Sequence, residues 1–253
     1  MRLLFITDNY PPEVNAPANR TFEHINCWKK KKDIKITVIT CHPNFPNGKI
    51  FKGFKNKLFS IEDEAGIKVI RVWTFIAPNK GVFKRILDFL SFAISSSIAG
   101  IFIKSDLIIA TSPQFFTTFS AFFLSKIKRI SWIFELRDLW PESINSLNVI
   151  KSKFILSFLE KIELFLYKDC DLIISLTNSY KENLIKRGIY PKKIKIIPNG
   201  VDLKLFNKEK HYKNISYCST KKKFTIGYIG TMGISHNLDF ILRTIDLYKM
   251  HDI

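Results

Sequence analysis

The chain has 253 residues, 46% of them hydrophobic, which is enough to bury a core and excludes an intrinsically disordered protein. Its 40 Lys and Arg residues outnumber its 22 Asp and Glu residues, and the formal net charge of +18 indicates an anionic partner. The lysines are spread along the chain, the 23 Phe residues lie mostly in apolar runs, and no nucleic-acid-binding motif is visible. Three anionic partners fit this charge: nucleic acid, anionic lipid and a phosphorylated substrate. Nucleic acid is the least favoured of the three.

Apolar runs rich in β-branched residues alternate along the chain with segments of helical periodicity. The expected strands are residues 2–7, 35–40, 68–74, 106–110, 130–135, 171–176, 194–197 and 224–229. The expected helices are residues 18–31, 83–103, 115–126, 154–167, 179–187 and 237–247. Several strands are apolar on both faces, as a parallel sheet covered by helices requires. The alternation predicts an α/β fold with a doubly wound, Rossmann-like parallel sheet.

The four cysteines, Cys27, Cys41, Cys170 and Cys218, lie far apart without a C-x-x-C motif. They indicate free thiols in a reducing compartment rather than a disulfide framework. The adjacent pair formed by Cys41 and His42 has no further ligand at metal-binding spacing, which favours an ordinary loop.

Two apolar segments bear on membrane insertion. The first follows Arg2 and stops at Asp8 without a small-residue cleavage site, so it is not a signal peptide. The second, residues 86–103, has the minimum length of a membrane span but carries Asp88 and four serines. A buried or interfacial helix is the favoured interpretation, and a true span is the alternative.

The first polar motif, residues 8–20, follows the first expected strand. Pro11 and Pro12 stiffen this loop, and Asn19 and Arg20 stand near the start of the next helix. Ligands of parallel α/β sheets bind beyond the carboxyl ends of the strands, and a helix N-terminus favours phosphate or hydroxyl groups. The motif predicts part of a ligand cleft, with a rigid structural turn as the alternative.

The second motif, residues 135–142, ends an apolar strand with charged side chains. Glu135, Arg137 and Asp138 are difficult to explain by packing, and Arg137 has the geometry to bind a carboxylate or phosphate. Trp140 offers an apolar wall for a sugar ring. The alternative is a structural ion pair of Arg137 with Asp138 or Glu135.

The third motif is Gly230-Thr231-Met232-Gly233, between the last expected strand and helix. Backbone amides at such a turn can hold a phosphate, and the absence of G-x-G-x-x-G argues against a nicotinamide enzyme. Upstream, Asn199, Gly200 and Asp202 lie in a polar turn that predicts a hinge, and the lysine-rich residues 207–223 predict a linker.

With these motifs in this order, the chain resembles the family 4 glycosyltransferases of the GT-B type over nearly all of its length. Residues 135–142 are similar to the fucosamine-transferase branch of bacterial surface polysaccharide synthesis. The resemblance implies an N-terminal acceptor-binding domain at residues 1–206, a linker at 207–223, and the incomplete start of a C-terminal donor-binding domain at 224–253. The resemblance thus implies that the chain is a fragment, and we expect that this fragment by itself does not transfer sugar.

The resemblance also implies the site and the chemistry. The residues expected in the acceptor cleft are Tyr10, Pro11, Glu13, Asn19, Arg20, Glu135, Arg137, Asp138 and Trp140. Residues 230–233 are expected to hold the donor diphosphate, and no catalytic residue is assigned. The family is retaining and works without a cofactor or a metal, and Asp169-Cys170-Asp171 precedes a strand, which favours a turn over a metal site.

The implied partners are a nucleotide sugar, a lipid-linked glycan acceptor and the anionic inner face of the cytoplasmic membrane, where the chain would be peripheral. The membrane-facing candidate combines lysines with phenylalanines, and a solvated basic loop is its alternative. Its residues are Lys49, Lys52, Lys55, Lys57, Phe51, Phe54 and Phe59. The alternative functions are a non-catalytic remnant or binding module and, less favoured, a basic nucleic-acid-binding protein.

Overall fold

The computed structural model describes residues 1–78, 82–112, 116–142, 152–200, 203, 227–230 and 236–249. The chain divides into two compact units, Met1–Gly200 and Val201–Ile253, which are treated separately below.

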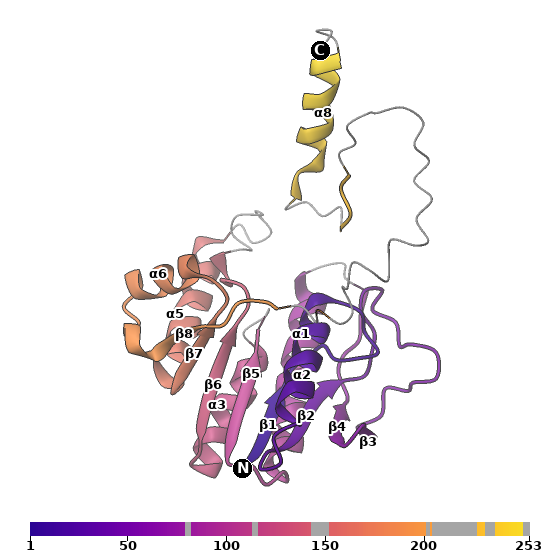
Figure 1. Cartoon of the computed structure of the whole chain (residues 1–253), viewed down its shortest axis with the longest axis vertical. Helices are drawn as coiled ribbons and strands as arrows, with labels where there is room; N and C mark the ends of the chain where they lie inside the picture. The colour runs from indigo at the N-terminus through magenta and orange to yellow at the C-terminus, as the bar shows by residue number, and fades with distance from the viewer. Residues whose placement is uncertain are drawn as a thin grey trace. The chain divides into compact units, whose positions relative to one another are not determined.

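The first unit is built on an eight-stranded sheet with the order β3-β4-β2-β1-β5-β6-β7-β8 (Figure 1). The strands are β1 (Arg2–Ile6), β2 (Lys35–Cys41), β3 (Phe59–Glu64), β4 (Ile67–Val72), β5 (Leu107–Thr111), β6 (Ser131–Leu136), β7 (Leu172–Ser175) and β8 (Ile194–Ile196). All neighbours pair in parallel except β3, which is antiparallel to β4. The chain reverses its direction of travel between β1 and β5, as in a doubly wound sheet, so the predicted fold class is confirmed.

Strand β3 was not predicted, because its sequence alternates apolar with charged side chains beside a lysine-rich loop. It forms a hairpin with β4 through Ala65 and Gly66, which have φ values of 53° and 82°. Two consecutive residues at positive φ are typical of the turns that match the twist of a hairpin.

The inner side of this hairpin is polar and converges on Arg71 of β4, which is fully buried. Its Nε donates to Glu62 at 2.8 Å and its Nη2 donates to Glu64 at 3.0 Å. The guanidinium also donates to the backbone oxygens of Pro11, at 2.6 Å, and Cys41, at 3.3 Å. One buried cation therefore connects the edge hairpin to the loop that follows β1.

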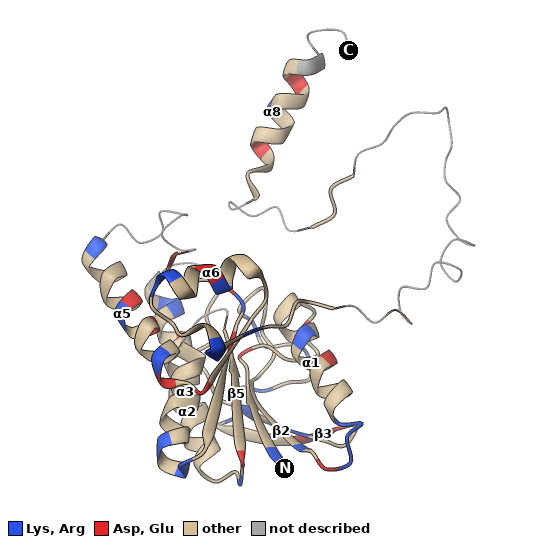
Figure 2. Cartoon of the chain, turned by 60° about the vertical axis from the view of Figure 1, so that its left-hand side comes forward, with Lys and Arg blue, Asp and Glu red and all other residues tan. Residues whose placement is uncertain are grey.

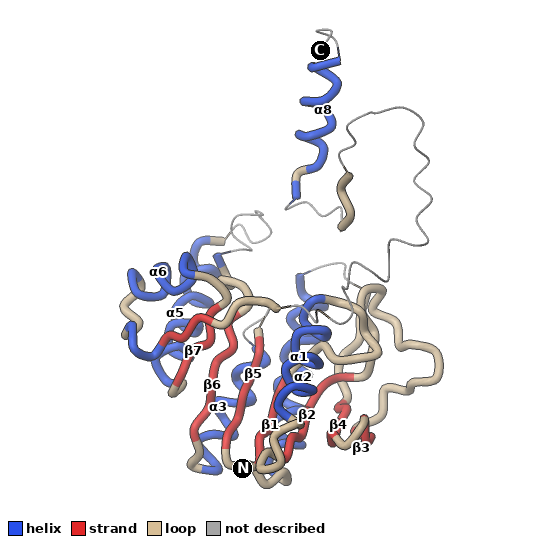
Figure 3. The backbone as a smooth tube through the Cα atoms, viewed as in Figure 1, coloured by secondary structure: helices blue, strands red, loops and turns tan. Residues whose placement is uncertain are grey.

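Helices cover both faces of the sheet (Figure 3). The helices of the first unit are α1 (Ala16–Trp28), α2 (Val82–Ile101), α3 (Phe116–Lys128), α5 (Lys153–Asp169) and α6 (Asn178–Lys186), with a 3-10 turn at Pro191–Lys193. Helix α1 packs through Ile25 on the face that carries Leu3 and Phe5 of β1. The other face, which carries Leu4 and Ile6, is covered by α2, α3 and α5. All five helices expected in this part of the chain are present.

Helix ends follow their local sequence. Asn15 caps α1, its Oδ1 accepting from the amide of Ala18 at 2.8 Å. Helix α6 ends at Lys186 and is followed by its C-cap Arg187 and by Gly188, which has a φ of 85°. The amide of Ile189 donates to the oxygen of Leu184 at 3.0 Å. A glycine at positive φ just after the cap is typical of this kind of helix end.

Helix α2 spans most of the apolar segment at residues 86–103. Within the described part of the chain, no helix combines the length and apolar character needed to cross a membrane. Phe92 and Ser96 face the interior, and the hydroxyl of Ser96 donates to the oxygen of Phe92 at 2.6 Å. Gly100 lies so close to Leu124 of α3 that a Cβ at this position would stand 2.3 Å from the leucine side chain.

The second unit is described at Leu203, at residues 227–230, and from His236 through helix α8 (Leu238–Lys249). Helix α8 confirms the helix expected at 237–247. Residues 227–229 are not in a strand, so the strand expected at 224–229 is wrong for its second half, and its first half lies outside the described residues.

Among the described residues, Cys27, Cys41 and Cys170 are free thiols, and no group of three or more His, Cys, Asp or Glu side chains could hold a metal ion. Cys218 lies outside the described residues.

Candidate functional site

A pocket of about 330 Å³ opens beyond the carboxyl ends of the strands, within the first unit. The loop after β1 contributes Asn9, Glu13 and Asn15 to its lining, and the start of α2 contributes Arg85 and Asp88. Trp140, from the loop after β6, forms part of the wall. The pocket thus joins the first and second polar motifs of the sequence, at the edge where parallel α/β sheets bind ligands.

Glu13 is the most deeply buried acid of this pocket, with 2% of its surface exposed. Its Oε1 accepts the amides of Asn44 at 2.8 Å and Phe45 at 2.9 Å, while its buried Oε2 has no hydrogen-bond partner among the residues that the structure describes. Burial raises the pKa of Glu13 to about 7, against the opposing effect of the two amides. The carboxyl group therefore changes charge near neutral pH.

Asp88 places a second acid in the pocket, from the second turn of α2. Burial and the neighbouring charge of Asp8 raise its pKa to about 7, and Arg85 opposes this rise. Both carboxyl groups can accept hydrogen bonds from the hydroxyl groups of a ligand, and they accept stronger ones when ionised.

An aromatic cluster forms the apolar side of the pocket. Phe89 stacks on Phe116 with ring centroids 6.1 Å apart, and Phe116 meets the edge of Trp140 at 6.0 Å. Arg85 lies over the ring of Phe89, with 5.5 Å between its guanidinium carbon and the ring centroid. An apolar wall beside polar groups matches the two faces of a sugar ring.

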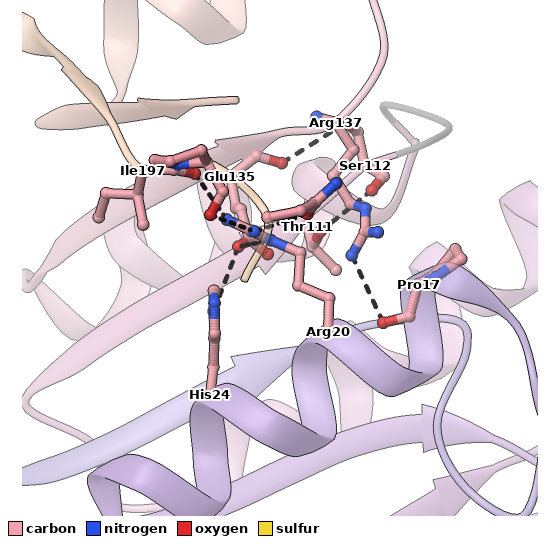
Figure 4. Close-up of polar contacts among 10 residues, drawn as sticks. Pro17, Arg20, His24, Thr111, Ser112, Glu135, Arg137 and Ile197 are labelled. Atoms are coloured by element: carbon pink, nitrogen blue, oxygen red, sulfur yellow. Dashed lines mark hydrogen bonds and ion pairs between the residues drawn. The ribbon is translucent and has the colours of Figure 1, made fainter. Parts of the chain in front are cut away.

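Arg20 forms a second polar cluster, between α1 and β6 (Figure 4). Its side chain is buried, and its Nε donates to Oε1 of Glu135 at 2.9 Å. The Nδ1 of His24, one turn along α1, lies 3.7 Å from the same oxygen. Glu135 therefore pairs with Arg20 and not with Arg137, which had been the expected alternative for a structural ion pair.

The rest of the Arg20 guanidinium holds the end of the first unit. Its Nη1 donates to Oδ1 of Asn199 at 2.7 Å and to the oxygen of Pro198 at 3.2 Å. Its Nη2 donates to the oxygen of Ile197 at 3.1 Å. All three nitrogens are thus occupied by protein oxygens, and the turn predicted as a hinge is fixed to α1 at this end.

Arg137 lies beside this cluster and is 7% exposed. Its amide donates to the hydroxyl of Ser112 at 2.9 Å, and its Nη1 donates to the oxygen of Pro17 at 3.4 Å (Figure 4). Burial lowers its pKa. Among the described residues Arg137 forms no ion pair with Asp138 or Glu135. Its guanidinium therefore keeps N–H groups that can donate hydrogen bonds to a ligand.

A family model for Glycosyltransferase Family 4 matches residues 30–205 of the chain. The chain belongs to Glycosyltransferase Family 4.

Solved structures are similar to this family 4 chain at low sequence identity. Sucrose-phosphate synthase from Thermosynechococcus elongatus is 12% identical with a TM-score of 0.53, over 81% of this chain and 49% of that one. HepE from Anabaena, in complex with UDP and glucose, is 16% identical with a TM-score of 0.47, over 81% and 46%. The UDP-GlcNAc 2-epimerase of Methanocaldococcus jannaschii is 13% identical with a TM-score of 0.44, over 79% and 46%.

The family 4 chain spans about half the length of these solved structures. A comparison with curated proteins finds no match. The matched fold is the Rossmann-like domain of the GT-B type.

The other residues expected in the cleft of the family 4 chain are dispersed. Tyr10 is buried in the core beside Phe22, with ring centroids 6.2 Å apart, and Pro11 accepts from Arg71 through its backbone oxygen. Asn19 and Asp138 are exposed. Of the nine expected cleft residues, only Glu13 and Trp140 line the pocket.

Of the expected donor loop, Gly230 is described and exposed, whereas Thr231, Met232 and Gly233 lie outside the described residues. Of the hinge residues, Asn199 and Gly200 end the first unit, and Asp202 lies outside the described residues.

Sequence reasoning missed several pocket residues of the family 4 chain, chiefly Asn44, Thr74 and Asp88. The signal for Asp88 was visible, because an acid inside the apolar segment 86–103 requires a polar environment. Asn44 and Thr74 follow strands β2 and β4, and their position beyond two parallel strands was the available indication.

Proposed function

We propose that this family 4 chain supplies the acceptor-binding part of a retaining glycosyltransferase, which moves a sugar from a nucleotide-diphosphate sugar to a glycan acceptor. The observation that carries the proposal is the pocket beyond the strand ends, with carboxyl groups on one side and Trp140 and Phe89 on the other. Family membership supports the sugar-transfer reaction and the nucleotide-sugar donor.

In this proposal, Glu13 and Asp88 accept hydrogen bonds from the hydroxyl groups of the acceptor sugar, while Trp140 packs against its apolar face. Arg137 donates to the backbone oxygen of Pro17 at the start of α1 and provides further donors for an anionic or hydroxyl-rich part of the acceptor. The donor diphosphate is held by the amides of the loop at residues 230–233 and by basic side chains, without a metal ion.

The acceptor we propose is a glycan on a polyprenyl diphosphate, as in the fucosamine-transferase branch of surface polysaccharide synthesis. The similarity of residues 135–142 to that branch supports this acceptor, and so does the net charge of +18, which suits a phosphorylated lipid at the inner face of the cytoplasmic membrane.

Calorimetry tests the proposal by measuring the affinity of the chain for a saccharide linked to polyprenyl diphosphate and for the same saccharide without the lipid. We expect Asp88→Asn to weaken binding about tenfold, because a hydrogen bond to a charged group is lost. The matched control is Asp106→Asn, which removes a carboxylate paired with Arg2 before β5, at the opposite edge of the sheet.

Equal loss in both variants, or no binding by the wild-type chain, would refute the placement of the acceptor. Transfer assays with a panel of nucleotide sugars complete the test. Saccharide binding without any transfer would favour the binding module that the sequence left open.

A further inference from the structure

The outer surface of helices α2, α3 and α5 is apolar, although it faces away from the sheet. The three helices form one layer on the same face of the sheet (Figures 1 and 2), with Phe122 of α3 and Phe165 of α5 in edge contact at 5.2 Å. We call the following residues the outer helical face: Leu90, Ile94, Ile98, Phe123, Ile127, Phe154, Ile155, Phe158 and Phe165. Each of them is between 40% and 83% exposed.

Helix α2 shows most clearly that this exposure is systematic. Leu90, Ile94 and Ile98 are spaced by four residues and form one stripe, while Phe92 and Ser96 form the buried stripe on the other side. A helix that is apolar all round is normally buried on all sides, and monomeric soluble proteins rarely expose continuous apolar patches of this kind. The outer helical face therefore indicates a surface that is covered in use.

Basic side chains surround this face. The exposed ones on or next to the three helices are Lys84, Arg85, Lys104, Lys126, Lys153, Lys161 and Lys168. Glu160 is an exposed acid among them, and its oxygen lies 3.5 Å from Arg187. A second copy of the chain would bring two basic borders together, which is unfavourable, whereas an anionic lipid surface is complementary to both the charge and the apolar side chains.

The sequence had suggested a different surface, the lysine-rich loop at residues 49–59. Its Phe51 and Phe54 are half-buried, and Phe54 lies under the guanidinium of Arg71 with 5.3 Å between the guanidinium carbon and the ring centroid. These two aromatic side chains pack on the protein, whereas Leu58 and Phe59 at the end of the loop are 81% and 64% exposed. The loop therefore exposes fewer large apolar side chains than the outer helical face does.

We propose that the outer helical face docks the chain on an anionic membrane, with its isoleucine and phenylalanine side chains in the apolar part of the interface and its lysines at the headgroups. Helix α2 connects this face to the pocket, since Arg85 and Asp88 near its start line the pocket, and Ile94 and Ile98 further along the same helix are exposed. The docking deepens the proposed function, which places the acceptor at a membrane, by naming the surface that would contact the lipid, and it is tested below without any acceptor.

Co-sedimentation with phosphatidylglycerol and phosphatidylcholine vesicles, without any acceptor, tests this. The variant is Ile94→Gln/Ile98→Gln/Phe158→Gln, in which exposed side chains become polar while helix propensity is retained. The matched control is Ile241→Gln/Ile245→Gln in α8, with the same spacing and exposures of 50% and 44%, against 61% and 57% for Ile94 and Ile98.

The wild-type chain should bind phosphatidylglycerol vesicles, less so at high salt, and phosphatidylcholine vesicles weakly. The triple variant should lose about tenfold or more in partitioning, with unchanged circular dichroism, while the control pair stays within about twofold of wild type. The single variant Ile98→Gln should show a smaller loss in the same direction, which guards against misfolding of the triple variant.

Three results would overturn the proposal. Equal binding to both kinds of vesicle would remove the role of anionic lipid, and equal loss in the α8 pair would move the contact to the second unit. Retained vesicle binding by the triple variant, with a dimer of the wild type becoming a monomer in sedimentation velocity, would make a second copy the occupant.

Discussion

The buried carboxyl group of Glu13 predicts a specific pH dependence of stability. Its pKa rises from an ordinary 4.5 to about 7 in the folded chain. Between these values the folded state holds a proton that the unfolded state has lost, so protonation stabilises the fold. This stabilisation is complete below pH 4.5 and is lost as the pH rises through 7. At 1.36 kcal/mol per pH unit, the difference amounts to about 3 kcal/mol.

The perturbation is Glu13→Gln, which keeps an oxygen for the amides of Asn44 and Phe45 but cannot ionise. Urea unfolding at pH 5 and pH 8 gives the two free energies of unfolding for each protein. Wild type should lose about 2.5 kcal/mol more than the variant between these pH values, because most of the titration falls inside this range. Glu163 also has a pKa raised to about 7, but it titrates in both proteins and cancels in the comparison. The pKa of Asp88 is raised to about 7 by burial and in part by the charge of Glu13, so the variant also loses a small part of the pH dependence that Asp88 contributes, which adds to the difference.

The matched control is Glu182→Gln, which removes an exposed carboxylate from α6 and should leave the difference between pH 5 and pH 8 near that of wild type. If Glu13→Gln keeps the full pH dependence of wild type, Glu13 is ionised throughout the range. The argument from burial would then be refuted.

Three further predictions concern the buried polar clusters. Arg20→Met should cost about 3–5 kcal/mol of unfolding free energy, because it leaves the carboxylate of Glu135 buried without its partner. Adding Glu135→Gln should recover part of this loss in a double-mutant cycle, and strict additivity of the two substitutions would contradict the pairing. Arg137→Lys should weaken saccharide binding while the melting temperature changes little, since it keeps the charge and loses the planar donors; unchanged binding would move the acceptor site elsewhere. Tyr167→Phe should cost about 1–3 kcal/mol in urea unfolding, because the hydroxyl donates to Glu163 at 2.5 Å in the core; a neutral result would mean that water or Arg187 replaces the bond.

The sheet could be predicted from the sequence because each parallel strand is a short apolar run and each helix has its own period. The sequence did not predict β3, since residues 59–64 gain their strand conformation from pairing with β4 and from the charge of Arg71, and not from an apolar pattern. Local sequence decides the first kind of element, and tertiary contacts decide the second.

The sequence indicated the edge of the sheet at which polar side chains gather, but not their contacts. Glu13 and Trp140, from the motifs after β1 and β6, line the pocket at this edge, and their role in binding stays a prediction. The bond between Arg20 and Asn199 joins residues 179 positions apart, and no spacing in the sequence indicates it. The same holds for the amides of Asn44 and Phe45 that bind Glu13, because backbone groups carry no signature in the residue types.

The network around Arg71 also determines which register β3 adopts. Phe59 and Ile61 point away from Arg71 and are 64% and 57% exposed, so apolar burial on that side gives little preference for one alignment. A slip of β3 by one residue would turn Glu62 and Glu64 to the opposite side and leave a fully buried guanidinium without its carboxylates. Such a loss costs several kcal/mol. The hairpin is therefore aligned by charge, in a sheet whose other strands are aligned by their apolar side chains.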